Sequence, residues 1–133
     1  MLLIIDNQNA FIKKFKSTFL SKHEIPYKML DHNQPIMLSE EQQVTGIILS
    51  GGRGNPFKPL NLTTNFIAMA RFNVPVLGFC LGHEIIAGTH GGQIDKLPGY
   101  YTKREPVHII KNGDKIFKGI NKERKRKCFE EAS

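Results

Sequence analysis

The sequence of 133 residues is poor in cysteine and has neither a long apolar run nor a basic leader. Two cysteines, Cys80 and Cys128, are too few for the dense disulfide framework of a small secreted domain, which favours a reducing, cytoplasmic location. Apolar runs such as 46–49 are far too short to cross a bilayer. Because no basic segment precedes the apolar start at 2–5, that start indicates a buried strand and not a signal peptide.

Positive charge is in excess, but without the pattern that favours nucleic-acid binding. The formal net charge is +7 at pH 7. Residues 122–127 carry five positive charges and one negative charge, and no aromatic residues are interleaved with them. We interpret the charge elsewhere as a solvated basic face and residues 122–133 as a charged tail. Charge alone supports a hypothesis of nucleic-acid contact or nuclear targeting.

Short apolar runs alternate with amphipathic segments, which is typical of an α/β fold. Residues 2–5 are continuously aliphatic, as in a central strand covered on both faces. The apolar residues of 8–22 recur at helical spacing. Pro26 limits the second strand to a sheet edge or a late start. We predict strands at 2–5, 25–30, 46–49, 75–79 and 107–110, and helices at 8–22, 62–72 (with Asn61 or Thr63 as N-cap) and 80–87.

The segment 78–82, Gly-Phe-Cys-Leu-Gly, is the most informative stretch. It lies between a predicted strand and a predicted helix, where Gly-x-nucleophile-x-Gly describes a nucleophile elbow. The turn is so sharp that side chains at Gly78 and Gly82 would clash. The helix N-terminus favours the thiolate of Cys80, and the N–H of Leu81 is placed to stabilise an oxyanion. The alternative is a buried structural cysteine, because free cysteine is among the most buried residue types.

Three segments together resemble the class I (triad) glutamine amidotransferases: Gly-Ile-Ile-Leu-Ser-Gly-Gly at 46–52, Pro-Val-Leu-Gly-Phe-Cys-Leu-Gly-His-Glu-Ile-Ile-Ala at 75–87, and Gly91-Gly92. Within that family the start at 3–7, Leu-Ile-Ile-Asp-Asn, most resembles the glutaminase subunit of archaeal-type, two-subunit GMP synthases. The resemblance implies a flavodoxin-like α/β fold, mainly a parallel sheet with helices on both faces. It covers residues 1–121.

The resemblance also implies a chemistry. Cys80 attacks the side-chain amide of glutamine, forms a glutamyl thioester and releases ammonia for an ATP-dependent synthetase subunit. In a GMP synthase this partner is the ATP-pyrophosphatase subunit, which activates XMP. The oxyanion and substrate-binding residues are Gly51, Gly52, Leu81 and Glu84, with the N–H groups of Gly52 and Leu81 as oxyanion donors. We predict neither a metal nor a cofactor.

The sequence departs from the family pattern most clearly at its end. Family members continue for some tens of residues and supply a histidine, two residues before a glutamate, that completes the triad. We therefore expect 1–121 to be an incomplete family domain, truncated at the C-terminus, and 122–133 to be a non-family tail. General-base assistance is worth roughly 10²–10⁴-fold, so we expect negligible glutaminase activity from these 133 residues.

Two further departures concern the substrate site. Glu84 replaces a glutamine that helps to hold the substrate, and a carboxylate there would repel the substrate's α-carboxylate. Arg53 replaces a proline after the glycine pair. His83, His90 and His108 are the nearest candidates for a replacement base, and each has the simpler interpretation of a surface or packing residue.

Several functional hypotheses remain open at this point. The first is a glutaminase subunit. The second is a non-catalytic relative that binds a synthetase partner, or an aberrant truncated product. A third is a cysteine hydrolase of α/β-hydrolase type, which the Ser-Gly-Gly segment ahead of the elbow disfavours.

Overall fold

A computed structural model describes residues 1–52, 61–95, 104–106, 115–119 and 127–129. The chain divides into two compact units, Met1–Ile94 and Asp95–Ser133. The predicted strand at 107–110 and the predicted domain end at residue 121 lie outside the described residues. In the described part of the chain, no helix combines the length and the apolar character needed to span a membrane.

The first unit contains a four-stranded parallel sheet with the order β2-β1-β3-β4. The strands are β1 (Leu2–Asn7), β2 (Tyr27–Asp31), β3 (Gly46–Gly52) and β4 (Val76–Gly78). This order and the parallel pairing confirm the predicted flavodoxin-like class. The prediction from Pro26 is also confirmed, because β2 starts directly after it and lies at an edge of the sheet.

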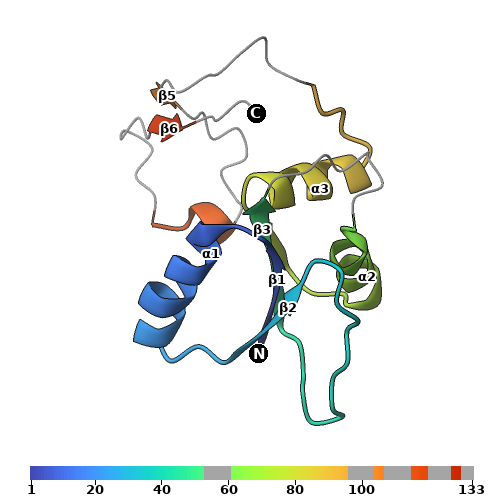
Figure 1. Cartoon of the computed structure of the whole chain (residues 1–133). Helices are drawn as coiled ribbons and strands as arrows, with labels where there is room; N and C mark the ends of the chain where they lie inside the picture. Colours follow the sequence, from blue (N-terminus) through green and yellow to red (C-terminus); the bar gives the residue numbers. More distant parts are fainter. Residues whose placement is uncertain (53–60, 96–103, 107–114, 120–126, 130–133) are drawn as a thin grey trace. The chain divides into compact units, whose positions relative to one another are not determined.

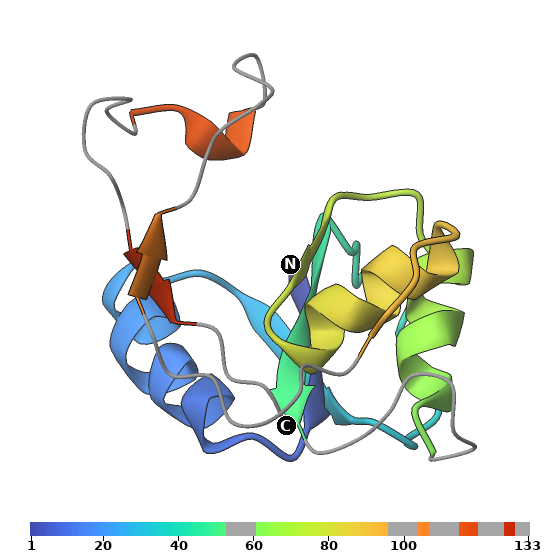
Figure 2. The ribbon, with the colours of Figure 1, turned by 90° about the horizontal axis from the view of Figure 1, so that it is seen from above.

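Helices cover both faces of this sheet, as predicted (Figures 1 and 2). The helix α1 (Ala10–Phe15) continues into a π-helical turn, η1 (Lys16–Leu20), and lies on one face. The helices α2 (Thr63–Arg71) and α3 (Leu81–Thr89) lie on the other face.

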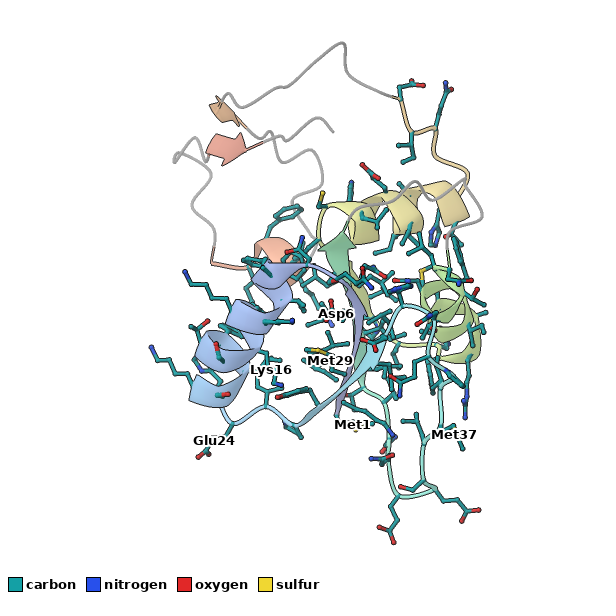
Figure 3. The ribbon with its side chains drawn as sticks, viewed as in Figure 1. Met1, Asp6, Lys16, Glu24, Met29 and Met37 are labelled. Atoms are coloured by element: carbon teal, nitrogen blue, oxygen red, sulfur yellow. The ribbon has the colours of Figure 1, made fainter. Side chains whose placement is uncertain are left out.

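The two faces of the sheet bury two separate hydrophobic clusters. Successive side chains of a strand point to opposite faces. Leu3 and Ile5 of β1 therefore join the cluster beneath α2 and α3, whereas Ile4 joins Ile12 and Leu20 of α1 and η1. Figure 3 shows Met29 of β2 directed toward α1, where it packs against the second cluster. Burial on both faces explains why β1 has no alternation of polar and apolar residues.

Two local predictions are wrong. The N-cap of α2 is Leu62, which provides no capping side chain, and neither Asn61 nor Thr63 has that role. Strand β3 does not end before Ser50 but continues through Gly52. The extension is held by contacts with β1, which lies more than 40 residues away in the sequence.

The second unit contains a short antiparallel pair, β5 (Arg104–Pro106) with β6 (Lys127–Phe129), and a 3₁₀ turn, η2 (Lys115–Phe117). Cys128 pairs with Glu105 in this ladder.

Candidate active site

The candidate site lies at the carboxyl ends of neighbouring strands. Strand β4 ends at Gly78, two residues before Cys80, and β3 ends at Gly52. Ligand sites of open parallel sheets occur at this edge, where the strand order reverses. Here the reversal falls between β1, which pairs with β2 on one side, and β3 on the other.

The elbow has the geometry that its glycines predict. Cys80 is the N-cap of α3 and has φ +50° and ψ −111°, a backbone conformation that residues with side chains rarely adopt. A Cβ atom at Gly78 would lie 2.5 Å from the backbone nitrogen of His83. One at Gly82 would lie 2.7 Å from the carbonyl carbon of Leu49. Both distances are shorter than van der Waals contact, so the turn has no room for side chains at either position.

Exposure of Cys80 decides between the two interpretations of the segment. Its side chain is exposed, whereas Leu81 and Gly82 directly after it are buried. The alternative of a buried structural cysteine is therefore wrong. The carbonyl of Cys80 accepts the N–H of Glu84 at 3.0 Å, which closes the first turn of α3. Among the described residues, no hydrogen bond uses the N–H of Leu81.

The glycine pair at the end of β3 lies beside the cysteine. A Cβ atom at Gly51 would lie 3.3 Å from the Cβ of Cys80 and 2.7 Å from Nδ2 of Asn9. Asn9 was not identified from the sequence. Its Oδ1 accepts the N–H of Phe11 at 2.7 Å as the N-cap of α1, so its amide nitrogen is on the side of Gly51.

A buried polar network fixes the strand ends below this point. The side chains of Asn7 and Asn65 exchange two hydrogen bonds, of 2.8 and 3.0 Å, between β1 and α2. Asn7 also donates from Nδ2 to the carbonyl of Ser50 at 3.0 Å and from its backbone N–H to Oγ of Ser50 at 2.7 Å. Asn7, Ser50 and Asn65 are at most 4% exposed, so each lost bond would leave a buried polar group unsatisfied.

Glu84 lies on α3 one turn beyond Cys80 and is half-buried. Burial raises the pKa of the Glu84 carboxyl, and the neighbouring His83 opposes that shift. A carboxyl group with a raised pKa carries less negative charge at a given pH.

None of the described histidines is hydrogen-bonded to Cys80. His83 follows the cysteine on α3 and is exposed. His90 is the C-cap of α3 and its Nδ1 bonds to the carbonyl of Ile86 at 2.8 Å. It therefore lies at the opposite end of the helix from Cys80. His108 lies outside the described residues.

A known family model matches nearly the whole chain, and the matched range includes the elbow and the glycine pair. The model for class-I glutamine amidotransferases matches residues 3–128. The chain belongs to this family.

Comparison with individual relatives points to one enzyme within the amidotransferase family. It is 33% identical over 126 residues to a glutamine-hydrolyzing GMP synthase subunit of Pyrococcus abyssi, covering 90% of this chain and 62% of the relative. The identity is 30% over 124 residues with the protein of the same name from Thermococcus kodakarensis (90% and 62%). It is 29% over 125 residues with that of Methanococcus aeolicus (92% and 63%). The chain thus spans about three fifths of the length of these curated relatives, and the predicted resemblance to GMP synthase glutaminase subunits is confirmed.

Proposed function

We propose that this amidotransferase chain is a glutamine-hydrolysing component whose nucleophile is Cys80. The observation that carries this function is the elbow: an exposed cysteine at φ +50°, at the start of α3 and beside the backbone of Gly51. Strained backbone of this kind persists only where its surroundings impose it, and it is concentrated at active sites. Gly78 and Gly82 provide those surroundings here.

The reaction begins when Sγ of Cys80 attacks the carbonyl carbon of the glutamine side-chain amide. The N–H groups of Gly52 and Leu81 stabilise the oxyanion, with Gly51 and Glu84 beside the substrate. The C–N bond then breaks, and the nitrogen leaves as ammonia with the proton of the thiol. Water cleaves the remaining glutamyl thioester to glutamate and returns a proton to the sulfur.

The names of the relatives extend the proposal to a partner. Each of these relatives is, by its name, one subunit of a glutamine-hydrolyzing GMP synthase. We propose that this chain passes ammonia to an ATP-dependent synthetase subunit for GMP formation in the cytoplasm. We propose that the family domain that carries this function is 1–121, with 122–133 as a tail.

A glutamine-like chloromethyl ketone with its carbonyl at C5, as in glutamine, 6-chloro-5-oxo-L-norleucine, tests the proposed site. We expect saturable labelling of Cys80 that glutamine suppresses and asparagine does not, measured by intact mass and peptide mapping. Cys80→Ser is the control for the labelled atom. Labelling of Cys80 that is insensitive to glutamine would contradict the function.

A non-catalytic role in partner binding is the second candidate, because no described histidine is hydrogen-bonded to Cys80. It predicts binding of a synthetase subunit without glutamine-protected labelling. Under the first proposal, ammonia release by the 133-residue chain alone is still negligible, since a general base contributes roughly 10²–10⁴-fold. Turnover at the rate of an ordinary glutaminase, abolished by Cys80→Ala, would contradict that expectation, and His108→Ala would then be the next variant to test.

A further inference from the structure

Strand β3 contains one more residue than the segment of β1 with which it pairs. Leu49 pairs with Ile5, and Gly52 pairs with Asn7, so three steps along β3 match two steps along β1. An extra residue of this kind is a β-bulge, which changes the direction of the backbone groups around it. This bulge lies at 50–51, directly beside the candidate nucleophile.

Two consecutive carbonyl groups of the bulge accept side-chain hydrogen bonds that lead to Asn7 of β1, one directly and one through the hydroxyl of Ser50. The carbonyl of Ser50 accepts from Nδ2 of Asn7 at 3.0 Å. The Oγ of Ser50 accepts the backbone N–H of Asn7 at 2.7 Å and donates to the carbonyl of Gly51 at 2.8 Å. One residue earlier, the carbonyl of Leu49 accepts the N–H of Phe79 on the β4 side. Carbonyls alternate in a regular strand, so only the bulge lets two successive ones face β1.

The direction of the Gly51 carbonyl sets the direction of the next N–H. A peptide group is planar and trans, so the carbonyl of Gly51 and the N–H of Gly52 point in opposite directions. Strand β3 lies between β1 and β4. A carbonyl directed at β1 therefore turns the N–H of Gly52 toward β4, from which the chain continues into Cys80.

We infer that Ser50 is a positioning residue whose hydroxyl, by closing the bulge, directs the N–H of Gly52 at the oxyanion that forms on the substrate of Cys80. This role rests on the glutaminase function proposed above and explains how one of its donors is oriented. The reciprocal amide pair of Asn7 and Asn65 acts indirectly, because it fixes Asn7, whose backbone N–H donates to the Ser50 hydroxyl.

The variant Ser50→Ala tests this role through the chloromethyl ketone. Sγ of Cys80 adds to the ketone carbon, which places a negative charge on its oxygen at the position of the oxyanion, and the sulfur then displaces chloride from the neighbouring carbon as the carbonyl re-forms. Loss of one oxyanion donor costs about 10²–10³-fold in rate. In Ser50→Ala the Gly52 N–H is still present but is no longer oriented by the bond from the Ser50 hydroxyl to the Gly51 carbonyl. It should therefore keep part of its stabilising effect, so we expect the maximal labelling rate of Cys80 to fall on the order of tenfold. The half-saturating concentration of the ketone should stay within about twofold, since the donor acts on the developing charge. Alkylation by iodoacetamide, which needs no oxyanion donor, should also change less than about twofold.

Thr64→Val is the matched control. Thr64 is 2% exposed, and its hydroxyl donates to the carbonyl of Gln34 at 2.7 Å, away from the bulge. The substitution Thr64→Val removes a buried hydroxyl hydrogen bond of similar length and should leave the labelling rates of Cys80 by the ketone and by iodoacetamide unchanged. If the parent protein shows no glutamine-protected labelling, the proposed function fails and the role of Ser50 fails with it. If the parent shows such labelling and Ser50→Ala retains the full rate, the role of Ser50 alone is refuted.

A measurement on the parent protein covers the case in which Ser50→Ala does not fold. The amide proton resonance of Gly52 should move downfield when the ketone is bound to Cys80, because its N–H then donates to the ketone oxygen at the position of the oxyanion. The amide of Gly92, which donates to the carbonyl of Ala87 at 2.7 Å, should not move. A Gly52 resonance unaffected by labelling would overturn the assignment.

Discussion

Substitution of Gly82 by alanine is the sharpest test of the elbow, because two effects of the added methyl group predict opposite changes in the free energy of unfolding. Gly82 is inside α3, where alanine is favoured over glycine by about 1 kcal/mol. A Cβ at this position, however, would lie 2.7 Å from the carbonyl carbon and 2.8 Å from the Cβ of Leu49. Relief requires that α3 move away from β3, which also strains the bond from the N–H of Phe79 to the Leu49 carbonyl.

The steric effect is the larger of the two. Overpacking costs roughly 1–3 kcal/mol, and a weakened backbone hydrogen bond adds about 1 kcal/mol. After the gain in helix propensity, we expect Gly82→Ala to lower the free energy of unfolding by about 1–3 kcal/mol, which lowers the Tm by about 5–15 °C. Urea and thermal unfolding followed by circular dichroism measure both quantities.

Gly91→Ala provides the comparison. Gly91 has φ +82°, and a Cβ there would have no neighbour within 4 Å. The variant therefore bears only the cost of a left-handed backbone, about 1–2 kcal/mol, without displacing α3 from β3. Iodoacetamide labelling of Cys80 should change in Gly82→Ala and not in Gly91→Ala. A Gly82→Ala protein that unfolds at the urea concentration of the parent would refute the steric account of the elbow.

Two further predictions concern titratable groups. Cys80 should react before Cys128 with limiting iodoacetamide, read by peptide mass mapping, because Cys80 is exposed at a helix N-terminus; earlier labelling of Cys128 would contradict this. Burial raises the pKa of Glu84 above its unfolded value, so the stability that this carboxyl contributes is full below the unfolded pKa and is lost as the pH rises through the folded pKa. Glu84→Gln should therefore raise the Tm at pH 7 and leave it unchanged near pH 3.5; parallel Tm–pH curves for the two proteins would disprove it.

The elbow could be predicted from the sequence because its determinants are local. Gly78, Cys80 and Gly82 lie within five residues, and the strand before them and the helix after them are recognisable from short apolar patterns. The parallel sheet followed in the same way from the alternation of strands and helices.

The support of the site could not be predicted, since it depends on register and on distant partners. Asn7 and Asn65 are separated by 58 residues, and neither lies in a motif that marks an amide pair. Likewise the bulge is defined only by the pairing of β3 with β1, which the sequence does not show. Without that pairing, Ser-Gly-Gly at 50–52 is typical of the end of a strand, whereas in the structure β3 continues through it. The π-helical turn η1 could not be predicted either, because a single wider turn hardly changes the helical spacing of the apolar residues.

The strained backbone at Cys80 has a consequence for how this sequence changes over generations. A residue with a side chain at φ +50° costs on the order of 1–3 kcal/mol, and glycine avoids most of that cost. Cysteine codons become glycine codons by a single nucleotide change, so a more stable chain is always one mutation away. Stability alone would favour that change, and only a use for the thiol opposes it. A cysteine at position 80 therefore indicates that selection has acted on chemistry at this turn and not only on folding.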